Sequence, residues 1–149
     1  MKIKNYGKGN IENINKIEKE FGIKLPNDYK EYLLNNNGVM IGEACFYLKE
    51  LKQYILMGVF YGIGTENNTI DIIKINKEFE DDIMENTLLI GEDDGGGMIL
   101  LIFDGSNDGI WYYDHSYFFK QSTDELNTYY ICETFTEFME ILEKTKYVE

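Results

Sequence analysis

The fold is decided by the stretch from Leu88 to His115, which reads LLIGEDDGGGMILLIFDGSNDGIWYYDH. It contains three apolar runs separated by two segments rich in glycine and acidic residues. Each run is too short for a helix and is rich in the residue types that favour strands. The middle run, Met98 to Phe103, is apolar at every position, which predicts a central strand covered on both faces. The stretch therefore predicts three consecutive strands joined by acidic turns at Gly91–Gly97 and Asp104–Gly109.

Upstream of this stretch, apolar residues at helical spacing predict two helices. The first follows Asn10, a favourable N-cap residue, and ends at Gly22, which suits the left-handed conformation of a helix end. The second helix follows the only proline of the chain, and Asn27 or Asp28 is predicted to cap it. Residues 1–9 show no regular pattern and are predicted to be a short tail.

Further strands and helices surround the central stretch. Three segments are predicted to be strands, the last of them either central in the sheet or bulged at a glycine: Val39–Ile41, Cys45–Tyr54 and Ile55–Ile63. Thr69 is predicted to cap a third helix. Residues 129–132 predict a strand, and residues 117–119 offer a further edge strand. Thr134 is predicted to cap a closing helix, with Glu137 completing a capping box. This order predicts an α+β fold with residues 1–149 as one domain.

The charge of the chain limits its partners. The formal net charge is −13, from 14 basic and 27 acidic residues. Such a chain repels nucleic acid and anionic membranes, and a basic protein would associate with it fastest. No apolar run approaches the roughly 20 residues of a membrane span. The N-terminus lacks the apolar core of a signal peptide, and Cys45 and Cys132 belong to no metal or redox motif, so we expect a cytoplasmic protein.

Both acidic turns resemble ligand-binding loops in part. Gly91–Gly97 is rich in glycine, but it lacks the lysine and hydroxyl residue of a phosphate loop, and its three acids would repel phosphate. It is interpreted as a strand connector or as an acidic loop facing a partner. Asp104–Gly109 copies the first half of a calcium loop, but His115 stands where the bidentate glutamate is needed. A hairpin turn is therefore favoured there.

Some residues of the sequence could be combined into a catalytic site, but the spacing between them does not indicate one. His115 could act as a base with Cys132 or Asp114, yet a hydrogen-bonded structural histidine at a strand end is favoured. The three carboxylates of residues 92–94 would need a turn to converge as an acid–base pair. We therefore predict no enzymatic activity, no cofactor and no metal, and a metal-dependent enzyme built on the acidic loops is kept as a separate hypothesis.

The aromatic residues of the third strand alternate between its two faces. Trp111 and Tyr113 lie on one side, and Ile110 and Tyr112 lie on the other. Aromatic residues fill cores and also dominate interfaces. We assign Trp111 to the core, and we take Tyr112 or Tyr113, beside the acidic turns, as the interface candidate.

Several motifs together resemble the SUKH superfamily, the Smi/Knr-type family of cell-wall regulators and immunity proteins. Phe21–Gly38, which reads FGIKLPNDYKEYLLNNNG, is similar to its N-terminal signature of Leu-Pro, tyrosine, an apolar pair and an Asn-Gly stop. The glycine loop at Gly91–Gly97, the apolar strand after it and Ile110–His115 resemble its second signature. Phe135–Phe138 matches the usual start of its last helix. The resemblance covers nearly the whole chain in the right order.

The resemblance implies a fold and a role. The fold is a mixed, mainly antiparallel sheet flanked by helices. The role is that of an immunity protein, which binds and neutralises a cognate polymorphic-toxin domain in a stoichiometric complex. Such toxins are often nucleases, and a basic nuclease suits the net charge of −13. The alternative is a non-enzymatic regulatory or scaffold module for an endogenous partner. The family has no catalytic residues, so none is assigned.

The predicted partner contacts lie in the two acidic turns and the strand beside them. Their selection assumes that acids on two neighbouring loops mimic a phosphate backbone. The predicted contacts are Glu92, Asp93, Asp94, Asp104, Asp108 and Tyr112.

Overall fold

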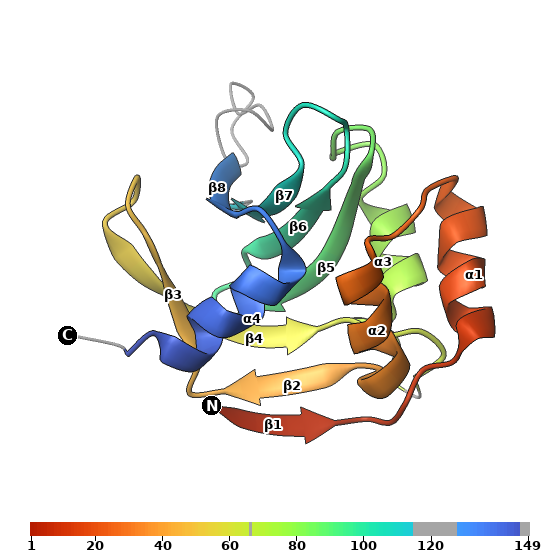
Figure 1. Cartoon of the computed structure of the whole chain (residues 1–149), viewed down its shortest axis with the longest axis horizontal. Helices are drawn as coiled ribbons and strands as arrows, with labels where there is room; N and C mark the ends of the chain where they lie inside the picture. Colours follow the sequence, from red (N-terminus) through yellow and green to blue (C-terminus); the bar gives the residue numbers. More distant parts are fainter. Residues whose placement is uncertain (66, 115–127, 147–149) are drawn as a thin grey trace.

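The computed structural model describes residues 1–65, 67–114 and 128–146, which form one antiparallel sheet with helices packed on it (Figure 1). The elements in chain order are β1 Lys2–Asn5, α1 Ile11–Phe21, α2 Asn27–Asn35, β2 Val39–Gly42, β3 Cys45–Leu48, β4 Gln53–Phe60, the 3-10 turn η1 Asn68–Ile70, α3 Ile72–Glu78, β5 Thr87–Asp93, β6 Met98–Ile102, β7 Gly109–Tyr113, β8 Thr128–Cys132 and α4 Phe135–Lys144.

The strands are ordered β1-β2-β4-β5-β6-β7-β8, and β3 pairs with β4 outside this path. Every pairing between these strands is antiparallel. The α+β class and the mainly antiparallel sheet are therefore confirmed. The predicted bulge is present at Gly58, where the register between β4 and β5 shifts.

The helices cover opposite faces of the sheet. Phe60 packs edge-on against Phe135 and Phe138 of α4, together with Tyr32 of α2. The next residue, Tyr61, lies in a pocket bordered by α3. Because successive residues of an extended chain point to opposite sides, α2 and α4 lie on one face and α3 on the other. Met98 to Ile102 are buried at every position, as the unbroken apolar run predicts.

Several predicted helix caps are confirmed. Asn10 accepts a hydrogen bond from the Asn13 amide at 2.8 Å, and Gly22 adopts the left-handed conformation with φ of 64°. Thr134 accepts from the Glu137 amide at 3.1 Å. These local signals act over one turn of chain, so they can be identified without knowing the tertiary structure.

Two other predicted caps are wrong. Helix α2 has Pro26 at its N-cap and no side-chain cap, so neither Asn27 nor Asp28 caps it. Asp28 instead accepts hydrogen bonds from the amide and hydroxyl of Thr136, at 2.9 and 3.0 Å, and so ties α2 to α4. A contact 108 residues away in sequence has taken the Oδ2 atom of this carboxylate, while Oδ1 accepts from the amide of the next residue, Tyr29.

The cap of α3 is also displaced from its predicted position. Thr69 lies in η1, and Asp71 caps the helix by accepting from the Lys74 amide at 3.0 Å. Thr69 instead directs its hydroxyl to Asn67. The short 3-10 turn moves the helix start two residues downstream.

The predicted N-terminal tail is in fact a strand. Residues 2–5 pair with β2, with Ile3 opposite Ile41. All four residues of β1 are exposed, so the segment has no buried side and no apolar alternation to reveal it. It is held by backbone pairing, continued by the hydrogen bond from the Tyr6 amide to the Gly38 carbonyl. The edge strand predicted at residues 117–119 lies outside the described residues.

Candidate functional site

The two acidic turns lie at opposite ends of β6. The turn between β5 and β6 precedes Met98, and the turn between β6 and β7 follows Ile102. Five strand residues at about 3.3 Å each separate them by about 17 Å. Consecutive antiparallel strands must reverse at alternate ends, so the expectation that the two loops are neighbours is wrong. The six predicted contacts are divided between two places.

The first acidic segment begins as strand and ends as a turn. β5 continues through Gly91 and Glu92 to Asp93, which shortens the predicted Gly91–Gly97 loop to its last four residues. As adjacent strand residues, Glu92 and Asp93 point to opposite faces of the sheet. Asp94, the next residue, is exposed in the turn.

Asp93 is buried and stabilises the β5–β6 turn through internal hydrogen bonds. Its carboxylate accepts from the Gly97 amide at 2.7 Å and from the Tyr112 hydroxyl. Burial, reinforced by the hydrogen bond to Asp93, raises the pKa of Tyr112. A Cβ at residue 97 would collide with the Tyr112 hydroxyl and ring, so only glycine fits there. Asp93, Gly97 and Tyr112 form one internal network that closes the β5–β6 turn.

The prediction for the aromatic side chains of β7 is corrected, because both interface candidates, Tyr112 and Tyr113, are buried, whereas Trp111 packs against the core without being fully buried. Tyr112 is buried and packs edge-on against Phe46 beneath α4. Trp111, which was assigned to the core, is only partly buried and faces the other side, where its ring lies 5.2 Å from that of Tyr130. Alternation indicated that the two residues point to opposite faces, but not which face α4 covers.

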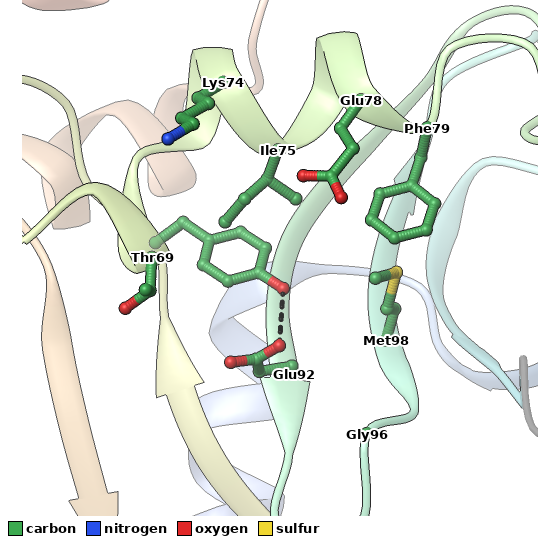
Figure 2. Close-up of a pocket in the computed structure, with 9 residues that line it drawn as sticks. Thr69, Lys74, Ile75, Glu78, Phe79, Glu92, Gly96 and Met98 are labelled. Atoms are coloured by element: carbon green, nitrogen blue, oxygen red, sulfur yellow. Dashed lines mark hydrogen bonds between the residues drawn. The ribbon is translucent and has the colours of Figure 1, made fainter.

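Glu92 borders a pocket on the α3 side of the sheet (Figure 2). The Tyr61 hydroxyl donates to Glu92 Oε2 at 3.2 Å, and burial together with this carboxylate raises the pKa of Tyr61. The pocket has a volume of about 370 Å³. Its lining residues are Tyr61, Thr69, Lys74, Ile75, Glu78, Phe79, Glu92, Gly96 and Met98.

In the turn between β6 and β7, the acidic side chains accept hydrogen bonds from backbone amides of the same turn. Asp104 Oδ1 accepts from the amides of Ser106 and Asn107, at 2.8 and 2.6 Å. These hydrogen bonds lower the pKa of Asp104. Asp108 accepts from the Gly105 amide at 2.8 Å. This is the pattern of a hairpin turn, in which the carboxylates point at amides of the same loop.

An aromatic pair lies beside this turn. Tyr130 of β8 is 42% exposed and stacks edge-on against Trp111, whose indole nitrogen donates to the Asn107 carbonyl. The two rings line a hollow in the surface, which Asp108 and Glu133 also border. Neither Tyr130 nor Glu133 was predicted as a site residue. Their signal lies in the pairing of Trp111 with Tyr130 across the two strands, which requires the register to be known.

Cys132, the candidate nucleophile that could pair with His115, is poorly suited to catalysis. Burial raises the pKa of the Cys132 thiol to about 12, so the thiol is protonated at neutral pH. Its Sγ lies 3.3 Å from the Thr134 carbonyl oxygen. His115 lies outside the described residues. Within residues 1–65, 67–114 and 128–146, no group of three or more histidine, cysteine or acidic side chains is arranged to hold a metal ion.

Charge is distributed unevenly along the chain. Residues 1–52 contain nine lysines and seven acids, whereas residues 53–149 contain five lysines and twenty acids. The second part includes β4 to β8, α3 and α4. The surplus of negative charge therefore belongs to the part of the molecule that carries both acidic turns and the pocket.

The comparisons with known proteins identify a family. The family model described as the SMI1 / KNR4 family (SUKH-1) matches residues 9–141, which run from the start of α1 into α4. A search of curated proteins found no match. Among the helices that the structure describes, none has the length and apolar character needed to cross a membrane.

Proposed function

The chain belongs to the SMI1/KNR4 family (SUKH-1), and from this premise we propose that it is an immunity protein that binds and neutralises a cognate polymorphic-toxin domain. The family match is the observation that carries the proposal. We further propose that the toxin is a basic nuclease, because an enzyme that grips nucleic acid presents positive charge to a protein of net charge −13. The proposed action is stoichiometric binding in the cytoplasm without catalysis.

We propose that the toxin contacts the end of the sheet formed by the β6–β7 turn. Asp104 and Asp108 are exposed there. The partly buried Trp111 and the exposed Tyr130 offer the large, rigid aromatic area that dominates binding energies. At the other end of β6, Glu92 and Asp94 stay candidate contacts. Asp93 and Tyr112 are buried in the network that closes the β5–β6 turn, and we propose that they hold that turn in place rather than touch the partner.

Calorimetry tests the function directly. The ligand is the C-terminal domain encoded by the adjacent open reading frame, titrated at low and at physiological ionic strength. We expect one-to-one binding whose association rate and affinity fall as salt rises, because exposed charges are screened. Nuclease activity of the domain should disappear at one equivalent of the chain. A domain that retains its activity in excess chain would contradict the immunity role.

A pair of exposed tyrosines tests the surface. Tyr130→Ala should weaken toxin binding by about thirtyfold, the effect of a moderate hot spot. Tyr47→Ala on β3 is the matched control, because Tyr47 is 46% exposed and its ring lies 5.0 Å from that of Tyr54 on β4. The control should bind like the parent chain. If only Tyr47→Ala weakens binding, the contact surface lies on the β3–β4 hairpin instead.

The second candidate function is a regulatory or scaffold module for an endogenous partner. It is compatible with the same family membership, because the resemblance described above implies cell-wall regulators as well as immunity proteins. It predicts co-purification with a housekeeping enzyme and a growth defect on deletion in the absence of any toxin. A deletion strain that grows normally until it is exposed to the toxin would instead support immunity.

A further inference from the structure

The aromatic pair beside the β6–β7 turn is positioned by an irregularity of β8. Ile110 of β7 is paired with Cys132 of β8. The next residue, Trp111, is paired with Tyr130, which leaves Ile131 as an extra residue between the two pairs. Without this bulge, the pairing of Tyr130 would shift by one residue and its ring would point to the face covered by α4. The bulge therefore places Tyr130 beside Trp111 on the face away from α4.

Two further contacts hold this pair in place. A Cβ at Gly109 would meet the Cys132 carbonyl oxygen and come close to the Tyr130 ring, so glycine permits the close approach of the two strands there. The indole nitrogen of Trp111 donates to the Asn107 carbonyl at 2.9 Å, which ties its ring to the turn. The two rings lie 5.2 Å apart at an interplanar angle of 70°, an edge-to-face arrangement. The aromatic surface is therefore preorganised, although Tyr130 is 42% exposed.

The hollow beside the aromatic pair lies in a negative part of the molecule. It has a volume of about 510 Å³, and none of its described lining residues is basic. The two segments that form it, residues 103–114 and 128–143, contain seven acidic residues and no lysine or arginine. Partial burial and the nearby carboxylate of Glu133 raise the pKa of Tyr130. The field at the exposed face of the pair therefore favours a positively charged group.

The acids that border the hollow differ in what they already hold. The start of α4 is stabilised by Thr134, which accepts from the Glu137 amide, and by the Glu137 carboxylate, which accepts from the Glu133 amide at 3.4 Å. These capping contacts use the backbone of Glu133 and not its side chain. Asp108, by contrast, accepts from the Gly105 amide within the turn. Glu133 is therefore the bordering acid whose carboxylate neither the turn nor the helix cap uses.

We propose that this hollow receives an arginine side chain of the toxin, an inference that rests on the proposed function. Its guanidinium would lie against the rings of Tyr130 and Trp111, with one edge toward Glu133. A planar guanidinium stacks on aromatic faces, is less strongly hydrated than an ammonium group and donates to carboxylates in a fixed geometry, so arginine is favoured over lysine. A nucleic-acid base can also stack on aromatic rings, but the surrounding acids would repel its phosphates.

Trp111 provides a direct readout, because it is the only tryptophan of the chain. Nα-acetyl-arginine methylamide is titrated into the free ¹⁵N-labelled chain at constant ionic strength, and the indole N–H resonance is followed. The corresponding citrulline derivative, which has a similar shape without the charge, is the neutral control. We expect a saturable shift with the arginine derivative and none with the citrulline derivative, with an affinity on the order of 10 mM. The lysine derivative should bind more weakly than the arginine derivative.

Substitutions distinguish stacking in the hollow from a general effect of charge. Tyr130→Leu should weaken binding of the arginine derivative about tenfold, whereas Tyr130→Phe, which keeps the ring, should weaken it by less than about twofold. Glu133→Gln should weaken binding about threefold, because it removes one exposed ionic contact. Glu140→Gln is the matched control, since it removes the same charge from an exposed position on α4 outside the described lining, and it should change nothing.

The outcomes separate this inference from the proposed function. An absent indole shift, an equal shift with the citrulline derivative, or equal weakening by Glu133→Gln and Glu140→Gln would overturn the arginine assignment, even if the toxin binds. An arginine-dependent shift in a chain that binds no toxin would contradict the immunity proposal and leave the recognition of arginine by the hollow in place. In a complex that does form, Glu133→Gln should also weaken toxin binding, while Glu140→Gln should not.

Discussion

The two turns that flank β6 both contain aspartates among glycines, but these aspartates have different structural roles. In the β5–β6 turn, Asp93 is buried and holds Gly97 and Tyr112 together. In the β6–β7 turn, Asp104 is exposed and holds only the amides of its own loop. An aspartate among glycines therefore supports the tertiary structure at one end of the strand and a local turn at the other. Reversing either charge would test different properties of the molecule.

This difference decides how the acidic surface can be studied. A substitution at Asp93 alters the core, so lost binding would say nothing about contact with a partner. Asp94, Asp104 and Asp108 are exposed and can be changed with less effect on the fold. The four predictions below sharpen the contrast between the two turns.

The largest effect is expected at Asp93. Asp93→Ala leaves the Tyr112 hydroxyl and the Gly97 amide without their acceptor inside the protein, which should lower the free energy of unfolding by about 3–5 kcal/mol. Urea unfolding measures this. The neighbouring Asp94→Ala is the control and should stay within about 0.5 kcal/mol of the parent. Equal effects at the two positions would mean that the turn network does not carry the stability assigned to it.

The second-largest loss of stability is expected for Gly97→Ala. The added methyl group meets the Tyr112 hydroxyl and ring, so the ring must move within a packed core, at a cost of about 2–3 kcal/mol. The comparison is Gly105→Ala in the other turn, where a Cβ meets no atom within 4 Å but the φ of 87° strains an alanine. We expect the cost at residue 105 to be smaller and limited to backbone strain, about 1 kcal/mol. Thermal unfolding of both variants provides the measurement.

Tyr112→Phe should cost about 1–2 kcal/mol and change the alkaline limb of the stability curve. The native pKa of Tyr112 is raised above its unfolded value of about 10, so its contribution is complete below pH 10 and is lost as pH rises further. The parent should therefore lose stability above pH 10 more steeply than the variant. The buried Tyr29 and Tyr61 have pKa values shifted in the same direction, so the variant curve should keep a slope. Curves with identical slopes would contradict the assignment.

The smallest effect is expected at Asp104. Its pKa is lowered by hydrogen bonds from its own loop, so its contribution is present above its unfolded pKa and is lost as pH falls through the folded value. NMR titration of the carboxyl carbon should place its midpoint below that of an aspartate in a peptide. Asp104→Asn should remove this acid-side dependence while changing the urea midpoint at neutral pH less than Asp93→Ala, Gly97→Ala or Tyr112→Phe. A midpoint at the ordinary aspartate value would show that the loop hydrogen bonds do not persist in solution.

Prediction from the sequence succeeded where local rules suffice. Asn10, Gly22 and Thr134 act on backbone groups within a few residues, and the apolar run at residues 98–102 identifies a buried strand without reference to its neighbours. It failed where a distant partner intervenes. Asp28 is taken by Thr136, and β1 exists because β2 offers it an edge.

The candidate site was predictable in composition but not in arrangement. The sequence by itself determined that the central strands are joined by two acidic turns and that the chain is strongly negative, because these follow from residue types and short spacings. Only the tertiary structure decided that Asp93 and Tyr112 are internal, that Trp111 and Tyr130 meet, and that Glu78 and Glu92 share a pocket. The physical reason is that burial and side-chain contact depend on strand register and on which face each helix covers, and both are set by packing between residues far apart in the chain.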